Sequence, residues 1–347
     1  MKILVDIGHP AHVHFFKNAI WKLESEGHNV KITARDKEIT TELLESYGFK
    51  YNNLGKNQKG LKNKAMGMIK TDLKLYKIAK DFNPEVLTGI HNPYIAHVSW
   101  FLRKPSLIFT DTEHAKLANV LTFPFSTAIY TPLCFKNNLG RKQIRYDGYH
   151  ELSYLHPNYF KPNLSIIDEL GIRKNELFTV IRFVAWDASH DRGNKGIDME
   201  NKRLIVKELE KYGRVLITSE SKPPVEFEPY RIKLSPKKMH DLLYYASLYI
   251  GEGASMATES GILGTPSIYI SSLIDTMGNF VELNHRYRLV YTYKDPNKAL
   301  DKALELLQNS ELKEEWKRKR ECLLNDKIDV TKFIVDNIKK YSCALDG

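Results

Sequence analysis

Cysteine is scarce in this sequence. Only Cys134, Cys322 and Cys343 occur in 347 residues. Their number is odd, and their spacing is not that of metal ligands. A disulfide framework is therefore excluded as the basis of the fold, and such cysteine usage is typical of a reducing cytosol.

Long apolar runs are also missing. No segment approaches the roughly 18–20 apolar residues of a membrane-spanning helix. The most apolar stretch, residues 120–135, is interrupted by Pro124 and Pro132. Met1 leads directly into the strand-like segment KILVDI, without the pattern of a signal peptide. We expect a cytoplasmic protein, with peripheral contact at the inner face of the membrane as an open alternative.

Acidic residues are fewer than basic residues, 42 against 52, which leaves a net charge of +10. Such a balance attracts an anionic partner, for example nucleic acid, an acidic membrane surface or a phosphorylated metabolite. No helix-turn-helix, RNP or zinc-finger pattern is present, so nucleic acid is not expected. The basic segment 57–70, with Met66, Met68 and Ile69 interleaved, is a candidate contact with an anionic membrane or a lipid-linked acceptor. A solvated helix face is the commoner structure for such a run.

Strand-like and helix-like segments alternate through most of the chain, which predicts an α/β fold with parallel sheets. The length allows two domains. The segment 136–162, rich in Tyr, Asn, Gly, His and Pro, reads as their connection. We expect one α/β domain at 1–160, a second at 161–328, and a final helix in 329–347 that packs back on the first domain. Expected elements include a helix at 113–121 and a strand at 232–234.

The most informative stretch is GEGASMATESGILGTPSIYI, residues 251–270. It reads as a strand end, a glycine turn and a helix, and glycine lets a backbone approach a ligand closely. We place Ser255 and Thr258 in the first helical turn, where unpaired N–H groups and the helix dipole attract phosphate. Glu259 is suited to accept hydrogen bonds from ribose hydroxyls. An ordinary βαβ crossover, with glycines needed only for tight turns, is the alternative.

Polar residues follow three strands of the first half. The turn after the first strand holds Gly8, His9 and His12, and histidine is suited to substrate contact or proton transfer. Metal binding is a weaker alternative because no carboxylate or cysteine lies nearby in the sequence, and we expect no metal site. At least one histidine of His12 and His14 is expected to be structural, because the two point to different sides of a helix.

The second and third of these strand ends carry His91 with Asn92, and Asp111 with Glu113. His91 is a candidate substrate contact, whereas Asn92 followed by Pro93 reads as a helix cap. His9, Asp111 and Glu113 are the candidate acid/base groups. Capping of a following helix is the alternative interpretation for the two acids.

Another polar stretch, RFVAWDASHDRG at 182–193, follows the first strand of the second half. Arg182 could neutralise a diphosphate, Trp186 could stack on a base or sugar, and His190 and Asp191 could transfer protons. A solvated loop is the alternative. Ser219, at the end of the next strand, is a weaker candidate for contact with the nucleotide.

Five segments carry a resemblance to a known family: IGHPAHVHFF, FTDTEHAKLAN, GYHELSYLHP, RFVAWDASHD and GEGASMATESGILGTPSI. Together they span most of the chain, and the sequence resembles the DUF354 family of archaeal and bacterial proteins. More remotely it is similar to GT-B enzymes that act on nucleotide sugars, namely the UDP-GlcNAc 2-epimerases and the UDP-GlcNAc transferase that makes lipid II.

In that larger group, the segment matching Gly253–Glu259, which includes Ala254, Ser255 and Thr258, binds UDP. Its small residues meet the diphosphate, the acid matching Glu259 takes the ribose hydroxyls, and the position of Arg182 lies near the nucleotide. The resemblance thus implies a Rossmann-like acceptor domain at 1–160 and a Rossmann-like nucleotide-sugar-binding domain at 161–328. The sequence lacks the GTRPE-like turn and the HRREN-like segment of the epimerases. The resemblance therefore implies a GT-B glycosyltransferase that uses a UDP-linked sugar, needs no cofactor, and serves the synthesis of glycoconjugates or cell-surface polysaccharides. A nucleotide-sugar epimerase and a non-catalytic nucleotide- or anion-binding protein at a membrane surface are the alternatives.

Overall fold

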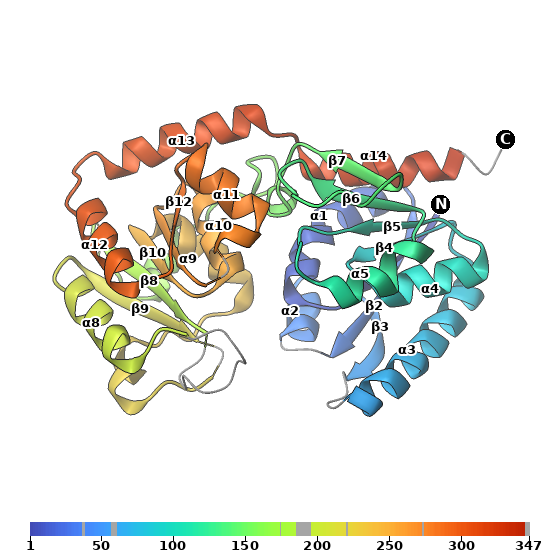
Figure 1. Ribbon diagram of the computed structural model, residues 1–347, viewed down its shortest axis with the longest axis horizontal. Coiled ribbons are helices and arrows are strands. Elements are labelled where there is room, and N and C mark those ends of the chain that lie inside the picture. Colours follow the sequence, from blue (N-terminus) through green and yellow to red (C-terminus); the bar gives the residue numbers. More distant parts are fainter. Residues whose placement is uncertain are drawn as a thin grey trace. The chain divides into compact units, whose positions relative to one another are not determined.

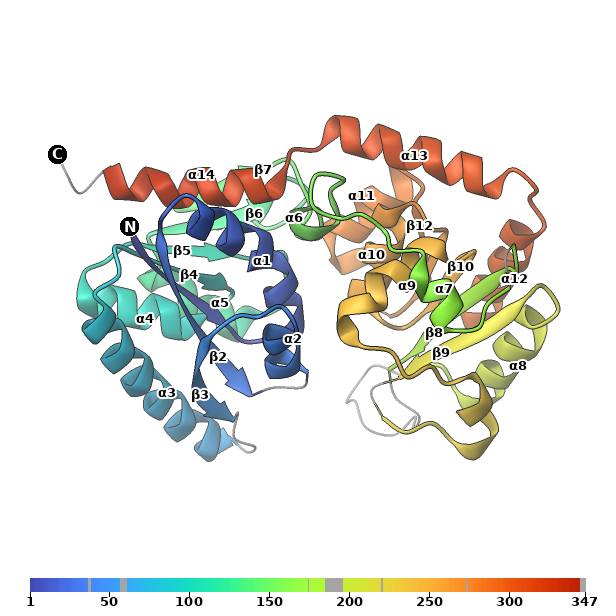
Figure 2. The ribbon, with the colours of Figure 1, turned by 180° about the vertical axis from the view of Figure 1, so that it is seen from behind.

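The computed structural model describes residues 1–36, 39–56, 61–173, 175–184, 196–219, 221–272 and 274–343. The chain forms two compact units (Figures 1 and 2). The first consists of Met1–Tyr159 together with Lys327–Gly347, and the second of Phe160–Asp326.

The first unit alternates strands and helices from its first residues. Its elements are β1 (Lys2–Ile7), α1 (Pro10–Ser25), β2 (Asn29–Asp36), α2 (Thr40–Ser46), β3 (Tyr51–Lys56), α3 (Leu61–Phe82), β4 (Val86–Ile90), α4 (Pro93–Leu102), β5 (Ser106–Phe109), α5 (Lys116–Thr122), the short 3₁₀ helix η1 (Phe123–Phe125), β6 (Ala128–Pro132), β7 (Gln143–Tyr146), α6 (Leu152–Leu155) and α14 (Val330–Cys343).

The strands of this unit form a seven-stranded parallel sheet in the order β3-β2-β1-β4-β5-β6-β7. The central strands β1, β4 and β5 are almost wholly buried, as expected of apolar strands covered on both faces. The chain runs outward from β1 to β3 and then returns to the other side of β1. The strand order thus reverses between β1 and β4, the position where parallel sheets bind ligands at the carboxyl ends of their strands.

Helices cover both faces of this sheet. α3, α4 and α5 contact one another in sequence on one face, and α1 contacts α2, α6 and α14 on the other (Figures 1 and 2). A buried apolar cluster under the first layer joins α3 and α4 to the sheet through Leu75, Ala79, Val98, Leu4 and Leu87.

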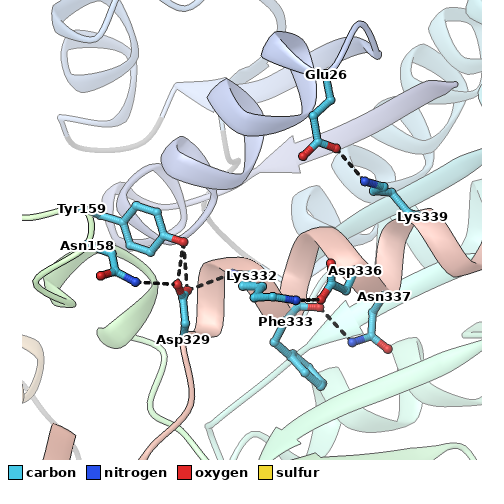
Figure 3. A network of polar contacts seen from close by, with 9 residues as sticks. All are labelled: Glu26, Asn158, Tyr159, Asp329, Lys332, Phe333, Asp336, Asn337 and Lys339. Carbon is cyan, nitrogen blue, oxygen red and sulfur yellow. Dashed lines mark hydrogen bonds and ion pairs between the residues drawn. The ribbon is translucent and has the colours of Figure 1, made fainter.

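The last helix, α14, belongs to the first unit. Its apolar side chains Val330, Ile334, Val335 and Ile338 are buried. At its start, Asp329 accepts hydrogen bonds from the Tyr159 hydroxyl at 2.7 Å and from Asn158 Nδ2 at 3.0 Å (Figure 3). Further along, Lys339 Nζ donates to Glu26 Oε2 at 2.7 Å, and Glu26 is the C-terminal cap residue of α1. The predicted return of the final helix to the first half is confirmed.

The second unit is also an alternating series. Its elements are α7 (Ser165–Glu169), β8 (Phe178–Phe183), α8 (Met199–Leu209), β9 (Arg214–Ser219), η2 (Val225–Tyr230), η3 (Pro236–Lys238), α9 (Met239–Tyr245), β10 (Leu248–Gly251), α10 (Ala254–Leu263), β11 (Ser267–Ile270), η4 (Ile274–Thr276), α11 (Gly278–His285), β12 (Val290–Tyr293), α12 (Pro296–Leu307) and α13 (Leu312–Asp326).

These strands form a five-stranded parallel sheet in the order β12-β11-β10-β8-β9. Here the order reverses between β8 and β10, so a ligand site is expected where these two strands end. The predicted α/β class with parallel sheets is confirmed in both units. No helix in the part of the chain that the structure describes is long and apolar enough to cross a membrane.

Three local expectations are wrong. The helix expected at 113–121 begins only at Lys116, because Ala115 and not an acidic side chain occupies its N-terminal cap. The segment 136–162, expected to connect the two domains, contains β7, which extends the first sheet beside β6. The segment 232–234 forms no strand; one bridge between Ile217 and Arg231 is the remaining pairing there.

Candidate functional site

The turn after β10 requires glycine at its first position. Gly251 pairs with Arg182 of β8. A Cβ atom on Gly251 would lie 2.3 Å from the carbonyl oxygen of Arg182, a distance that no real side chain tolerates. The glycine therefore allows the two central strands to end side by side at the reversal point of the sheet.

Gly253 brings the turn against the side chain of Arg182. A Cβ atom there would lie 2.8 Å from Arg182 Cγ and 3.1 Å from the Tyr249 hydroxyl. That hydroxyl donates to the Gly253 carbonyl at 3.0 Å. Burial raises the pKa of Tyr249, so the hydroxyl remains a donor at any physiological pH. The Tyr249 hydroxyl thus holds the turn at Gly253, and the Arg182 side chain packs against the same turn.

The helix that follows begins without a side-chain cap. α10 starts at Ala254, and Gly253 at the cap has no side chain with which to accept a first-turn N–H. Ser255 is exposed in this first turn. Backbone N–H groups of this kind, together with the positive end of the helix dipole, form an anion-binding site. The polar N-terminus of α10 therefore lies at the reversal point of the second sheet.

Thr258 lies one turn beyond the position expected for it. Its side chain is buried, and its hydroxyl donates to the Ala254 carbonyl at 2.7 Å. The placement of Thr258 in the first turn is wrong, because α10 begins at Ala254 and Thr258 is its fifth residue.

Glu259 is a buried carboxylate with a histidine partner. Its Oε1 lies 3.1 Å from His240 Nε2 of α9, and the two side chains are only 8% and 5% exposed. A charge is costly to bury without a partner, so this pair fixes the carboxylate in one orientation. His240 was not singled out from the sequence, because nothing local links it to a residue 19 positions away.

Glu252, between the two glycines, was also missed. Its Oε2 accepts from the Val184 N–H at 3.2 Å, and its Oε1 accepts from the Ile197 N–H at 2.8 Å. The carboxylate thereby joins the two described chain segments on either side of 185–195. The candidates Trp186, His190 and Asp191 lie outside the described residues.

Ser219 ends β9 and pairs with Phe183 of β8, so it lies at the same sheet edge as Arg182. Its hydroxyl donates to the Ser221 carbonyl at 2.7 Å. The strand register brings Arg182, Ser219 and the turn at Gly253 to the carboxyl ends of three neighbouring strands.

In the first unit, the histidines after β1 bind local backbone groups. His9 caps α1, where its Nδ1 accepts from the Ala11 N–H at 3.2 Å. His12 Nδ1 accepts from the Gly8 N–H at 3.3 Å. Both neutral rings therefore carry their proton on Nε2. His14 is buried between Tyr47 and Tyr154, which confirms that one of these histidines is structural.

A buried aspartate organises the reversal point of the first sheet. Asp6 is fully buried; it accepts from the Thr33 hydroxyl at 2.6 Å and from the Asn92 amide. Arg35 Nη2 lies 3.2 Å from Asp6 Oδ2, the oxygen that also accepts from Asn92, and the guanidinium lies over the Tyr94 ring. A Cβ atom on Gly8 would overlap this guanidinium. The sequence analysis missed both Asp6 and Arg35, because each lies inside a strand segment.

Asn92 caps α4 by accepting from the Ile95 N–H at 3.2 Å, so the capping interpretation of Asn92 is confirmed. His91 before it has a positive φ of 43°. Its ring stacks on Phe123, and its Nδ1 lies 3.3 Å from the Thr110 hydroxyl. Burial lowers the pKa of His91, opposed in part by Asn119 and Asp111, so the ring is neutral near pH 7.

Asp111 pairs with a histidine that the sequence analysis did not select. His150 Nδ1 lies 3.4 Å from Asp111 Oδ2, with the histidine almost fully buried and the aspartate partly exposed. The His150 ring contacts Phe15 and lies parallel to Tyr146. Burial lowers the pKa of His150, and the Asp111 charge opposes this shift. In the sequence His150 lies in the segment GYHELSYLHP, and nothing local links it to Asp111.

Glu113 lies near this pair in the sequence but is buried. Its Oε1 accepts from the Lys136 N–H at 3.4 Å, and its own carbonyl accepts from Asn137 Nδ2 at 3.0 Å. Neither Asp111 nor Glu113 caps α5. Among the described residues, no group of three or more His, Cys, Asp or Glu side chains is placed to hold a metal ion.

Residues 1–342 match the family described as "Protein of unknown function (DUF354)". The chain belongs to this family. A protein of Methanocaldococcus jannaschii, described as uncharacterized protein MJ0665, is 28% identical over 281 residues, which cover 77% of this chain and 81% of that protein.

Solved structures share the fold. The UDP-GlcNAc 2-epimerase of Neisseria meningitidis bound to UDP-GlcNAc has a TM-score of 0.69 at 16% identity, covering 98% of this chain and 100% of that one. The glycosyltransferase SsfS6 of Streptomyces sp. SF2575 has a TM-score of 0.60 at 12% identity, covering 96% and 99%. The DUF354 chain therefore has the fold of GT-B glycosyltransferases and UDP-GlcNAc 2-epimerases.

Proposed function

We propose that this DUF354 protein is a glycosyltransferase-like enzyme that uses a nucleotide-activated sugar, with a UDP-linked sugar as the donor. The observation that carries the proposal is the second unit's reversal point. There a glycine turn, an uncapped helix N-terminus and the oriented Glu259 carboxylate follow one another within residues 251–259. This sequence of groups matches the chemistry of a nucleoside diphosphate.

Each part of the nucleotide has a complementary group. The backbone N–H groups at the start of α10, the Ser255 hydroxyl and Arg182 suit the diphosphate. Glu259, one turn further along, suits the ribose hydroxyls as an acceptor. The solved structures that share the fold include a protein bound to UDP-GlcNAc, which supports the same ligand class.

In this proposal the first unit binds the acceptor and supplies the base. Asp111 is the preferred base, because its carboxylate is partly exposed and paired with His150. It would remove the proton from the acceptor hydroxyl as that oxygen attacks the sugar carbon. Positive charge from Arg182 and the start of α10 would stabilise the departing nucleoside diphosphate. His9 and His91 are proposed to contact the acceptor.

Calorimetry tests the nucleotide site. Titration with UDP is expected to show saturable binding that Glu259→Ala abolishes, while GDP, CMP and dTDP rank the base preference. Glu210→Ala, an exposed acid at the end of α8, is the control of equal charge change. Binding of UDP by the Glu259→Ala protein with unchanged affinity would show that the site assignment is wrong.

A second candidate, epimerisation of the sugar on its nucleotide, is favoured by one observation. The first unit holds several titratable groups around one position, namely Asp111, His150 and Tyr146. Epimerisation needs proton removal and return at a sugar carbon. Incubation of UDP-GlcNAc in deuterated water, without acceptor, separates the two. Deuterium in the recovered nucleotide sugar indicates epimerisation, and its absence with product formed on an added acceptor indicates transfer.

A further inference from the structure

The first unit exposes aromatic side chains at the end of α4. Trp100 and Phe101 are 58% and 70% exposed, although they are the kind of residue that folding normally buries. They contact each other at a ring-centroid distance of 5.3 Å, and Trp100 contacts Phe125 of η1 at 5.8 Å. The aromatic rings therefore form one cluster and are not scattered singly.

Neighbouring helices extend this apolar surface. On α5, Leu117 and Val120 lie three residues apart and are largely exposed, and on α3 Leu73 is likewise exposed. The three helices lie side by side in one layer (Figure 1). His97 of α4 joins them, since its Nδ1 lies 3.0 Å from Asp72 Oδ2 of α3 and its Nε2 lies 2.9 Å from the Leu121 carbonyl of α5. We call this surface, formed by Leu73, Trp100, Phe101, Leu117 and Val120, the α3–α5 surface.

A cavity of about 740 Å³ opens beside the aromatic cluster. Its described walls combine Trp100, Phe101 and Phe125 with three cations and no acidic residue; the cations are Arg103, Lys104 and Lys142. Lys142 is held in place because its Nζ donates to the Pro124 carbonyl at 2.6 Å. The cavity thus offers apolar walls and positive charge to one ligand.

Basic residues also lie along the two outer helices. On α3, Lys70 and Lys77 are exposed one turn before and one turn after Leu73. On α5, exposed Lys116 precedes Leu117. Cations therefore lie beside the apolar side chains on α3, at the start of α5 and at the end of α4.

We propose that the α3–α5 surface binds the surface of an anionic phospholipid membrane, with a lipid phosphate in the cavity beside Trp100. Tryptophan is favoured where apolar and polar environments meet, as at the headgroup level of a bilayer. Each lysine or arginine near an anionic leaflet adds attraction, which falls off within a Debye length. Aromatic and aliphatic side chains enter the boundary of the acyl chains, while the bordering cations contact lipid phosphates. The surface requires no spanning helix.

Vesicle binding tests this proposal. The protein is expected to sediment with vesicles that contain phosphatidylglycerol, to bind vesicles of phosphatidylcholine alone at least tenfold more weakly, and to be released by high salt. Trp100→Ala with Phe101→Ala should abolish binding. Lys104→Glu is expected to weaken binding about fivefold or more, from the contribution of one charge at an anionic surface.

Control variants in the second unit test whether binding depends on the α3–α5 surface or only on the net charge of the protein. Lys313→Glu changes the net charge by the same amount on exposed α13 of the second unit, and is expected to leave vesicle binding unchanged. Leu164→Ala removes an exposed apolar side chain from that unit in the same way. Thermal unfolding of each variant verifies that it is folded.

The depth to which Trp100 enters the membrane is measured by tryptophan fluorescence. Brominated lipids are expected to quench the emission of the wild-type protein, and Trp100→Phe should remove that quenching while binding persists. Equal binding to both vesicle types, or full binding by the Trp100→Ala, Phe101→Ala protein, overturns the proposal. A dimer in light scattering that this double variant dissociates also overturns it, because the surface would then bind a second copy of the chain.

Discussion

His240 Nε2 and Glu259 Oε1 lie 3.1 Å apart inside the second unit, one on α9 and the other on α10. The carboxylate proposed for the ribose hydroxyls is therefore held by a side chain that does not itself belong to the glycine-rich stretch. If Glu259 binds the ribose as proposed, the affinity of the site should depend on a residue outside its motif.

Removal of this histidine is expected to weaken nucleotide binding and stability together. His240→Ala leaves the buried Glu259 carboxylate without this partner, which costs on the order of 1–3 kcal/mol of unfolding free energy. UDP affinity should fall about tenfold, because the carboxylate loses its orientation. His240→Gln keeps a donor near the position of Nε2 and should restore most of both. Urea unfolding and calorimetry measure the two effects; equal losses in the Ala and Gln proteins would contradict the orienting role.

Glu252 is expected to fix the backbone on both sides of 185–195. Glu252→Ala removes two acceptors, with a loss of roughly 1–2 kcal/mol. Glu252→Gln retains one acceptor and presents an N–H₂ group to the other backbone N–H, so it should lose about half as much. Hydrogen exchange should accelerate at the amides of Val184 and Ile197, which donate to this carboxylate. Unchanged exchange at these two amides would refute the assignment, and Glu210→Ala serves as the control.

Substitutions at Gly251 and Gly171 compare two costs of adding a Cβ atom. One is a clash with neighbouring atoms, and the other is a left-handed backbone conformation. A Cβ atom at Gly251 would overlap the Arg182 carbonyl, whereas one at Gly171 meets nothing within 4 Å. Gly251→Ala is expected to cost about 3 kcal/mol or more, because two paired strands must move apart. Gly171→Ala, at a φ of 59°, should cost only the roughly 1–2 kcal/mol of a left-handed non-glycine residue. Denaturant unfolding measures both; equal costs would mean that close packing at Gly251 is not the constraint.

The pH dependence of stability should reveal the charge on His97. The hydrogen bond to Asp72 raises the pKa of His97 despite partial burial. The folded protein therefore binds this proton more tightly than the unfolded chain. The resulting stability is complete below the unfolded pKa of about 6.5 and is lost as pH rises through the folded pKa. His97→Gln should thus cost more at about pH 5.5 than at about pH 8.

The contribution of His150 to the pH dependence of stability is expected to have the opposite sign. Burial lowers the pKa of His150, so the unfolded chain takes up a proton that the folded protein resists. Stability is lost as pH falls below about 6.5, and His150→Gln removes that loss. The cost of His150→Gln should therefore be smaller at about pH 5.5 than at about pH 8. Urea unfolding of wild type and both variants at the two pH values tests both signs, and a pH-independent difference would disprove either one.

The sequence was sufficient to predict the alternating strands and helices and the glycine turn after β10, because alternating periodicity and glycine spacing are local signals. Gly251, Gly253 and Ser255 lie where that spacing placed them, at the end of a central strand and the start of a helix. The strand order that makes this the reversal point of the sheet is not local, and only the structure provides it.

Pairs of distant residues could not be found in the same way. Asp111 was selected because it follows a strand, but its partner His150 lies 39 positions later and its pairing depends on the fold. Glu113 resembled a helix-capping acid, yet the helix begins at Lys116 and the carboxylate is buried against another loop. Asp6 and Arg35 had no signal of their own, because Asp6 is a lone polar residue among the apolar residues 3–7 of β1 and Arg35 is one of several polar residues of β2.

The position of α14 determines the order in which the two units can be completed during synthesis. Residues 330–343 leave the ribosome after all of the second unit, yet they cover α1 and pack Phe333 against Tyr130 and Tyr146. Until then the first unit exposes the apolar surface that α14 will cover, while the second unit, continuous in the chain, already has all its residues. The unit whose synthesis begins first is therefore completed last, and a nascent chain that ends between α13 and α14 would hold a complete second unit beside an incomplete first unit.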